Sequence, residues 1–151
     1  MGTMYATCPF DKWGIDIVGK LPTAPGGKCF LIVAVDYFSK LVEAKAVSKI
    51  DECTIERFLW RNICCRYGSP RVLVSNNGSQ FTGKRIEEFC HRMDIIQRFI
   101  SVAHPQANGH VELTNRTICE GLKSDWKKVN GDVRKSWMVF CGLIEPAQKL
   151  L

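Results

Sequence analysis

The segments RVLVSNNGSQF, residues 71–81, and HPQANGHVELTNRT, residues 104–117, decide the architecture of this chain. The first is a β-rich run that ends in a turn at Asn76, because Asn and Gly favour turn conformations. The second is a polar loop that enters a helix at His110. Thirty-five residues separate Asn76 from Glu112, which falls in the first turn of that helix.

Upstream of this stretch, three segments have the alternation or the β-branched content of strands: residues 13–18, 29–38 and 41–47. Their short connections predict an antiparallel meander. A helix is expected over residues 51–67, because apolar residues recur there at helical spacing until Gly68 ends the run.

The second half of the expected fold alternates strands with helices. We expect a strand over residues 71–75, a helix over 84–93, a fifth strand over 95–100 and a further helix from His110. Antiparallel strands first and helix-separated strands later are typical of an α/β fold with a mixed five-stranded sheet flanked by helices.

Length and composition are those of one soluble globular domain. The chain has 151 residues, of which 46% are hydrophobic and 24% are charged. No apolar run approaches the roughly 20 residues that cross a bilayer, and no signal-peptide pattern opens the chain, so we expect neither a membrane span nor secretion. The net charge of +6 favours a polyanionic partner.

The eight cysteines do not form a recognisable disulfide framework or zinc site. No Cys-x-x-Cys spacing occurs, and Cys64 and Cys65 are adjacent, which is a poor arrangement for a bridge. Several other cysteines lie in apolar segments, where Cys acts as a small hydrophobic residue. We therefore expect free thiols in a reducing compartment, the nucleus or the cytoplasm.

Asp16 in a strand, an acid at the end of the fourth strand and Glu112 in a helix would suit phosphoryl-transfer chemistry if the fold brought them together, and the fourth strand ends at Asn76. Such chemistry uses two divalent cations about 3.5–4 Å apart, and Mg²⁺ prefers carboxylate oxygens. Each residue alone also has an ordinary explanation. Asp16 could be structural, Glu112 could complement a helix dipole, and Asn76 could belong to a turn.

Four segments together resemble the integrase catalytic core of long-terminal-repeat retroelements, in particular the Ty3/gypsy type of plants. They are WGIDIVG, FLIVAVDYFSKLVEA, RVLVSNNGSQFTG and SVAHPQANGHVELTNRT, in that order, and the resemblance covers about residues 9–123. It implies an RNase H-like fold and metal-dependent transfer of element DNA into host DNA. It also implies Mg²⁺ or Mn²⁺ as cofactor, DNA as partner and assembly into a homo-oligomer.

The resemblance assigns the catalytic and metal-binding positions to Asp16, Asn76 and Glu112. The family's second acid belongs in a Ser-Asp-Asn-Gly segment, which reads Ser-Asn-Asn-Gly here. An amide brings no negative charge and cannot bridge two cations as a carboxylate does, so we expect this copy to be inactive or nearly so. The residues that the resemblance places along the nucleic acid are Gln106, Asn108, Gly109, Asn115, Arg116, Cys119 and Lys123.

After Lys123 the resemblance stops, which divides the chain into a core-like domain, residues 9–123, and a divergent tail, residues 124–151. The tail can be encoded so that a shifted reading frame gives RLEK and then FLWAYRTSPKAT, which looks like the family's next helix. We therefore hypothesise a frameshift, which would leave the C-terminal helix of the fold missing or altered.

Two other functions stay open. A non-catalytic module that binds nucleic acid or a partner would keep the fold and show salt-dependent DNA binding without any transfer activity. An ordinary RNase H-like nuclease is disfavoured by the HPQANG loop before Glu112. Cleavage of an RNA–DNA hybrid would favour it.

Overall fold

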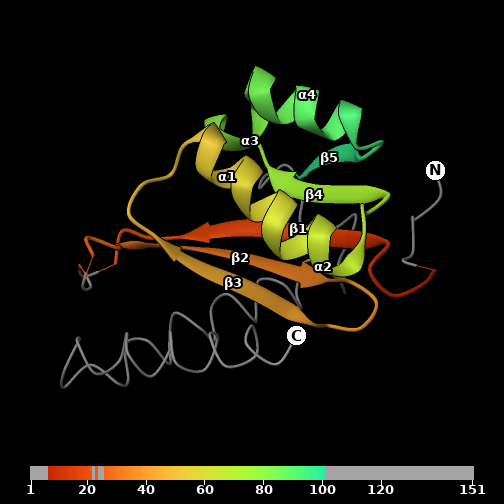
Figure 1. Ribbon diagram of the computed structural model, residues 1–151, viewed down its shortest axis with the longest axis horizontal. Coiled ribbons are helices and arrows are strands. Elements are labelled where there is room, and N and C mark those ends of the chain that lie inside the picture. The colour runs from red at the N-terminus through yellow and green to blue at the C-terminus, as the bar shows by residue number, and fades with distance from the viewer. Residues whose placement is uncertain (1–6, 22, 24–25, 101–151) are drawn as a thin grey trace.

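The computed structural model describes residues 7–21, 23 and 26–100, and its centre is a five-stranded sheet in the order β3-β2-β1-β4-β5 (Figure 1). Its strands are β1 (Lys12–Val18), β2 (Phe30–Asp36), β3 (Val42–Val47), β4 (Val72–Asn76) and β5 (Ile96–Ile100). The first three strands form the predicted antiparallel meander, whereas β4 pairs in parallel with β1 and β5 in parallel with β4. The mixed sheet is therefore confirmed.

The helices follow the predicted order, with two local differences. They are α1 (Glu52–Phe58), η1 (Leu59–Cys64), α2 (Cys65–Tyr67), α3 (Ser79–Thr82) and α4 (Lys84–Arg92). The first three are consecutive and occupy the range where one helix was predicted, but η1 is a π-helix, which periodicity does not reveal. The short helix α3 was not predicted, because only a turn was expected there.

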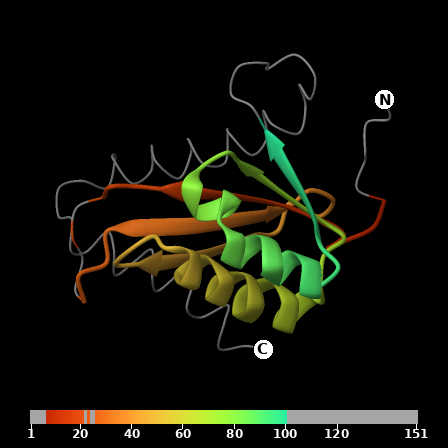
Figure 2. The same cartoon turned by 90° about the horizontal axis from the view of Figure 1, so that it is seen from above.

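Helices α1 and α4 lie side by side over one face of the sheet (Figure 2). The core beneath them joins Trp13 and Ile15 of β1 to Phe58 of α1 and Phe89 of α4, and these four side chains are at most 4% exposed. Burial of such large apolar groups contributes about 1.5–3 kcal/mol each, so this layer holds the helices on the sheet.

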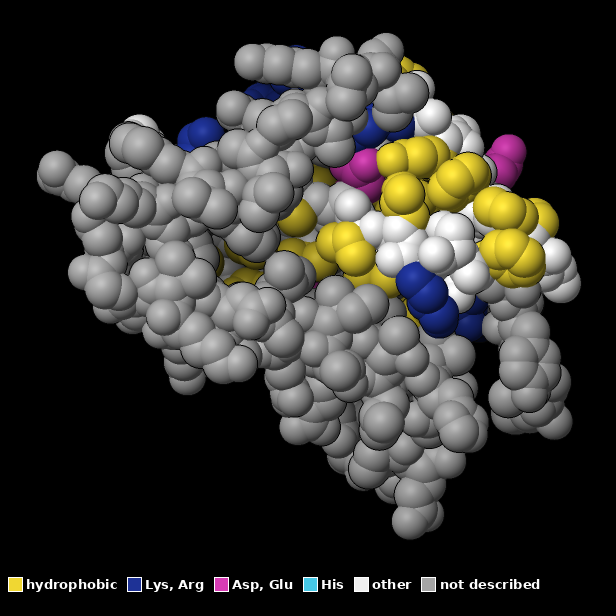
Figure 3. All heavy atoms as spheres, turned by 90° about the horizontal axis from the view of Figure 1, so that it is seen from below, with side chains coloured by type: hydrophobic (Ala, Val, Ile, Leu, Met, Phe, Trp, Pro, Cys, Tyr) yellow, Lys and Arg dark blue, Asp and Glu magenta, His cyan; other side chains and the backbone are white. Residues whose placement is uncertain are grey.

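The opposite face of the sheet carries a second set of apolar side chains. Val18, Leu31 and Val33 are in one cluster there, and Val72 and Val74 are in another. Seen from below, hydrophobic side chains of the described residues gather with few charged groups among them (Figure 3). Since side chains alternate along a strand, residues of β1 and β4 with even numbers face this second side.

The β2–β3 connection differs from the sequence-based expectation at Phe38. A buried strand was predicted over residues 29–38, but β2 ends at Asp36 and the Phe38 side chain is 52% exposed in the turn. The buried carboxylate of Asp36 accepts hydrogen bonds from Ser39 Oγ at 2.6 Å and Ser39 N at 3.0 Å, so it fixes this turn. Among the described helices, none is long and apolar enough to cross a membrane. The predicted helix from His110 and the tail lie outside the described residues.

Candidate active site

Asp16 and Asn76 are brought together by the parallel pairing of β1 with β4, two strands that lie next to each other in Figure 1. Gly14 is paired with Val74 in the register of these strands. Two residues further along each strand come Asp16 and Asn76, which therefore share one face of the sheet. Residues that are 60 positions apart in the sequence are neighbours for this reason.

The two side chains face each other through an amide hydrogen and a carboxylate oxygen. Nδ2 of Asn76 donates to Oδ1 of Asp16 at 3.5 Å, and the backbone N–H of Ile17 donates to the same carboxylate oxygen at 2.8 Å. The other end of the amide, Oδ1 of Asn76, accepts from the backbone N–H of Gly78 at 2.8 Å. This second bond fixes which end of the amide points toward Asp16.

Gly78 makes this arrangement possible because it has no side chain. A Cβ atom at position 78 would lie 2.8 Å from Oδ1 of Asn76 and 2.6 Å from Nε2 of Gln80, closer than real Cβ atoms approach. The glycine therefore lets the chain fold back against Asn76 at the end of β4. The segment from Asn76 to Gly78, where the sequence predicted a turn, therefore orients the side chain at position 76.

Asp16 differs from Asp36, the other strand aspartate, in what surrounds its carboxylate. Asp36 is fully buried and its two oxygens accept from Phe10 N, Ser39 N and Ser39 Oγ. Asp16 is only partly buried, and the hydrogen bonds that it accepts from the described residues engage one oxygen, Oδ1. Asp36 is thus a structural residue, and Asp16 is the more accessible carboxylate.

The described part of the predicted metal site does not fit a bridged metal pair. Asp16 supplies one carboxylate, whereas Asn76 supplies a neutral amide whose oxygen already accepts from Gly78. Within the described ranges, no group of three or more His, Cys, Asp or Glu side chains is placed to hold a metal ion. Glu112 lies outside the described residues, as do the predicted nucleic-acid contacts Gln106, Asn108, Gly109, Asn115, Arg116, Cys119 and Lys123.

Basic residues that the sequence reasoning did not single out lie on the same face as Asp16. Lys12 precedes it on β1, and Arg98 is paired with Val74 in the β4–β5 register. Burial lowers the pKa of Lys12, and the charges of Arg71 and Arg98 lower it further. Lys12 and Arg98 place positive charge on this face, which suits a polyanion. The alternation of side chains along β1 and β5 was the sequence signal that could have placed Lys12 and Arg98 on this face.

Comparison with known proteins identifies relatives of this architecture. The family profile described as the integrase core domain matches residues 6–105. The chain is 31% identical over 124 residues to the Gag-Pol polyprotein of avian reticuloendotheliosis virus, which covers 82% of this chain and 11% of that protein. It is 26% identical over 111 residues to the Transposon Tf2-3 polyprotein of Schizosaccharomyces pombe, and the match covers 73% of this chain and 8% of that protein. The chain thus spans about a tenth of the length of these relatives.

A solved structure shares both the fold and part of the sequence. The catalytic core domain of BIV integrase superposes with a TM-score of 0.58 and 26% identity, and the match covers 83% of this chain and 77% of that chain. The RNase H-like arrangement expected from the sequence is therefore confirmed, and the described sheet and helices are those of that class.

Proposed function

Because the chain belongs to the integrase core family, which is related to DNA integration, we propose that it is a decayed catalytic core whose strand-transfer activity is lost at Asn76. The family binds DNA and generally uses divalent metal ions. We assign this copy to a retroelement of the Ty3/gypsy type. The sequence segments around Asp16, Asn76 and Glu112, which resemble those of plant elements, support this assignment.

The observation that carries the proposal is the amide that faces Asp16. A carboxylate at position 76 would bring a second negative charge to this point, and Mg²⁺ or Mn²⁺ would stabilise the pair. Asn76 instead donates a hydrogen bond to the carboxylate of Asp16 and brings no charge. Loss of several kcal/mol of metal stabilisation lowers a rate by roughly a thousandfold or more, which removes practical activity.

We also propose which residues of the domain contact DNA. Gln106, Asn108, Gly109, Asn115, Arg116, Cys119 and Lys123 are proposed to contact nucleic acid before and after Glu112. Lys12 and Arg98, on the face that carries Asp16, add positive charge nearby. We expect DNA binding that weakens with added salt, since phosphate contacts release counterions.

The experiment that tests this proposal restores an aspartate at position 76. The full-length chain and its Asn76→Asp variant are compared for Mn²⁺-dependent strand transfer into plasmid DNA, with Mn²⁺ binding measured separately by calorimetry. We expect no measurable Mn²⁺ binding by the unchanged chain, and both binding and transfer by the variant. Equal activity before and after the change would refute the loss at Asn76. Asn77→Asp, which adds the same charge at the neighbouring exposed position, is the matched control.

Calorimetry also distinguishes a defect in the metal site from a defect in the tail. If Asn76→Asp binds Mn²⁺ but transfers no DNA, then a further defect lies elsewhere, and the proposed frameshift after Lys123 is the first place to look. The nucleotide sequence around codons 76 and 124 tests that directly. If neither protein binds Mn²⁺, the assignment of Asp16 and position 76 to a metal site is wrong.

The alternative function is a module that binds DNA or a partner without catalysis. Salt-dependent DNA binding that persists in Asn76→Asp, without any transfer in Mn²⁺, would favour it. We further propose an intracellular, reducing location and self-association. The first is supported by the six cysteines of the described residues, which are all free thiols, and size-exclusion chromatography with light scattering tests the second.

A further inference from the structure

The turn between β4 and α3 contains an Asn-Gly pair, and Asn77 has no role in the function proposed above. Asn77 is exposed, Gly78 follows it directly, and α3 begins at Ser79. Asparagine and glycine both favour turns, and glycine has no side chain to shield its backbone nitrogen. A side-chain amide and the next backbone nitrogen are the two groups that react when an asparagine is deamidated. The turn therefore contains both reactants of a chemical modification.

The reaction needs only water and the atoms of these two residues. Once Gly78 N has lost its proton, it attacks Cγ of Asn77, and the new N–Cγ bond closes a succinimide ring. The side-chain nitrogen takes up a proton and leaves as ammonia. Water then opens the ring at either carbonyl, which gives aspartate or isoaspartate. No atom is oxidised or reduced, so the reaction requires no further reactant.

The structure restrains the nitrogen that starts this reaction. The backbone N–H of Gly78 donates to Oδ1 of Asn76 at 2.8 Å. The Gly78 carbonyl accepts from Phe81 N at 2.9 Å and from Thr82 N at 3.1 Å, so both backbone polar groups of the glycine are engaged. Because the nitrogen must lose its proton before it can attack, the hydrogen bond to Asn76 opposes the first step.

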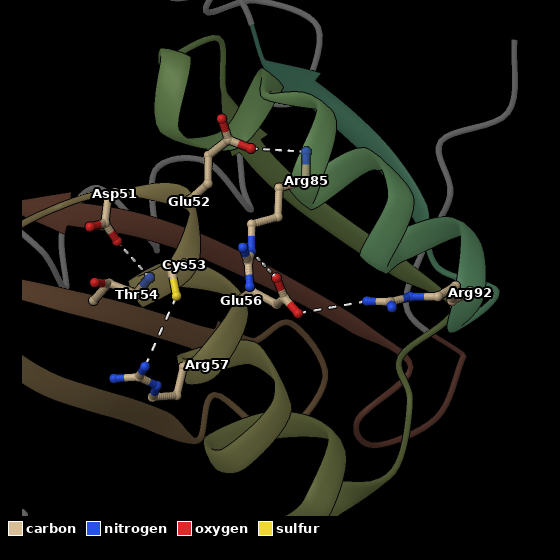
Figure 4. A network of polar contacts seen from close by, with 8 residues as sticks. All are labelled: Asp51, Glu52, Cys53, Thr54, Glu56, Arg57, Arg85 and Arg92. Atoms are coloured by element: carbon tan, nitrogen blue, oxygen red, sulfur yellow. Dashed lines mark hydrogen bonds and ion pairs between the residues drawn. The ribbon is translucent and has the colours of Figure 1, made fainter.

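The chain that follows Gly78 is also held in place. Nε2 of Gln97 in β5 donates to the carbonyl of Phe81 in α3 at 3.2 Å. Just after α3, Oε2 of Glu52 accepts from the backbone N–H of Arg85 at 2.9 Å, which ties the start of α4 to α1 (Figure 4). These contacts fix α3 and keep Gly78 against Asn76.

We propose that Asn77 is a modification site at which spontaneous deamidation produces aspartate or isoaspartate, and that Asn76 sets its rate by holding the Gly78 N–H. The exposed amide and the glycine that follows it favour the reaction, whereas the hydrogen bond at Gly78 slows it. The reaction uses neither a metal nor DNA, so it is independent of the proposed loss of strand transfer.

Asn76 itself is protected where Asn77 is not. Nδ2 of Asn76 donates to Oδ1 of Asp16 at 3.5 Å, and Oδ1 of Asn76 is held by Gly78, so the side chain is fixed at both ends. The backbone nitrogen that would attack it belongs to Asn77, which carries a side chain. We therefore expect the reaction at position 77. The distinction matters because deamidation of Asn76 would create the aspartate that this chain lacks.

The two products at position 77 should differ in their effect on the candidate active site. Isoaspartate adds a carbon to the backbone before Gly78 and so moves the Gly78 N–H away from Asn76. The hydrogen bond that orients the Asn76 amide toward Asp16 is then lost. Aspartate keeps the length of the backbone and adds only a negative charge at an exposed position.

The test follows the full-length chain during incubation at pH 8, folded and in guanidinium chloride. Peptide mass spectrometry assigns each modification to one asparagine, and enzymatic methylation identifies isoaspartate. The variants are Asn76→Ala, which removes the acceptor, Asn76→Asp, which keeps one, and Asn77→Gln, whose longer side chain closes a less favourable ring. Circular dichroism verifies their folding.

The sequence also provides internal references, because it contains two further Asn-Gly pairs, Asn108–Gly109 and Asn130–Gly131. We expect Asn77 to react in the folded chain, and to react about fivefold faster in guanidinium chloride, where one hydrogen bond at Gly78 is lost. Folded Asn76→Ala should show a similar increase, and Asn76→Asp none. Asn77→Gln should remove the product at this position. The two reference pairs should react at rates that these substitutions leave unchanged.

The comparison of the folded with the denatured chain needs no variant, and equal rates at Asn77 would overturn the control by Asn76. A rate at Asn77 that is the same in folded Asn76→Ala and in the unchanged chain would do so too. Product at Asn76 in place of Asn77, or no product at Asn77 in the folded chain while the denatured chain reacts, would show that Asn77 is not a modification site of the native protein.

Discussion

The amide nitrogen of Asn76 lies 3.5 Å from Oδ1 of Asp16, across the pairing of two parallel strands. The amide oxygen is held by Gly78 N–H at 2.8 Å, so the side chain does not need to rotate to make this contact. An asparagine here therefore stabilises the sheet without any cation. Replacing it by aspartate exchanges a hydrogen-bond donor for a second negative charge.

We expect Asn76→Asp to make folding dependent on metal and on pH. Without metal at neutral pH, the repulsion between two carboxylates should lower the free energy of unfolding by about 1–2 kcal/mol. Repulsion raises the pKa of the new carboxyl in the folded state. The loss of stability should therefore be absent at pH values below the pKa that the new carboxyl has in the unfolded chain. It should appear as the pH rises above that value. Thermal unfolding between pH 3.5 and 7.5, with and without 10 mM Mn²⁺, measures both effects.

The control for this prediction is Asn77→Asp, at the exposed neighbouring position. It has the same change in net charge but no facing carboxylate, so its stability should depend on neither Mn²⁺ nor pH beyond the unchanged chain. If Asn76→Asp were as stable as the unchanged chain in EDTA at pH 7, then the close approach of residue 76 to Asp16 would be wrong.

The order of strands and helices followed from the spacing of apolar residues, which differs between strands and helices. β1 alternates Trp13 and Ile15 toward the helices with Asp16 away from them, and α4 buries Ile86 and Phe89 on one face. The π-helix was not predictable in the same way. Residues 59–64 keep an apolar spacing that fits an α-helix equally well, and backbone hydrogen bonds such as that from Cys65 N to the carbonyl of Trp60 distinguish the π-helix.

Part of the candidate site was also readable in the sequence, and part was not. The adjacency of Asp16 and Asn76 rests on strand pairing between segments 60 residues apart, which the resemblance implied and the register shows. Their catalytic and metal-binding roles stay predictions, as does Glu112. The packing of α1 against α4 was not predicted, because helical spacing gives faces but not partners.

We predict that Glu52 caps α4 across the gap between helices, and that Gly83 is required for it. Oε2 of Glu52 accepts from the backbone N–H of Arg85 at 2.9 Å, and a Cβ atom at position 83 would overlap the Glu52 carboxyl. Gly83→Ala should displace that carboxyl and cost about 0.5–2 kcal/mol, the usual value of an N-terminal cap. Urea unfolding measures the loss.

A double-mutant cycle distinguishes this cap from a general effect of alanine. Glu52→Ala alone should cost a similar amount, because it removes the same hydrogen bond. In the Glu52→Ala background, Gly83→Ala should cost less than it does in the unchanged chain, since the overlap with the Glu52 carboxyl is then gone. Additive losses would show that the two residues do not act through one contact.

We predict that the stability of the domain falls at alkaline pH because of Tyr67. Burial raises the pKa of Tyr67 to about 12, and the hydrogen bond from its hydroxyl to Glu43 at 2.6 Å contributes to the shift. The unfolded chain loses this proton at a lower pH than the folded chain. The stabilisation is therefore complete below about pH 10 and is lost as the pH rises through 12.

The comparison that isolates Tyr67 is Tyr67→Phe, which keeps the ring contacts with Phe10 and Trp13. This variant should be less stable at pH 8, because Glu43 loses one donor and, among the described residues, keeps Arg66 at 2.7 Å. Its stability should decline less between pH 10 and 12 than that of the unchanged chain. Parallel declines in chemical denaturation would exclude Tyr67 as the titrating group.

Cysteine reactivity should follow burial in the described part of the chain. Burial raises the pKa of Cys90 to about 12 and that of Cys64 to about 11, whereas Cys8 and Cys65 are exposed. Since the thiolate is the reactive form, iodoacetamide at pH 8 should modify Cys65 about a hundredfold or more faster than Cys90. Peptide mass spectrometry over time identifies each site. In urea the two rates should converge, because unfolding removes the burial that protects Cys90. Equal rates in the native protein would contradict the burial of Cys90 on the inner face of α4.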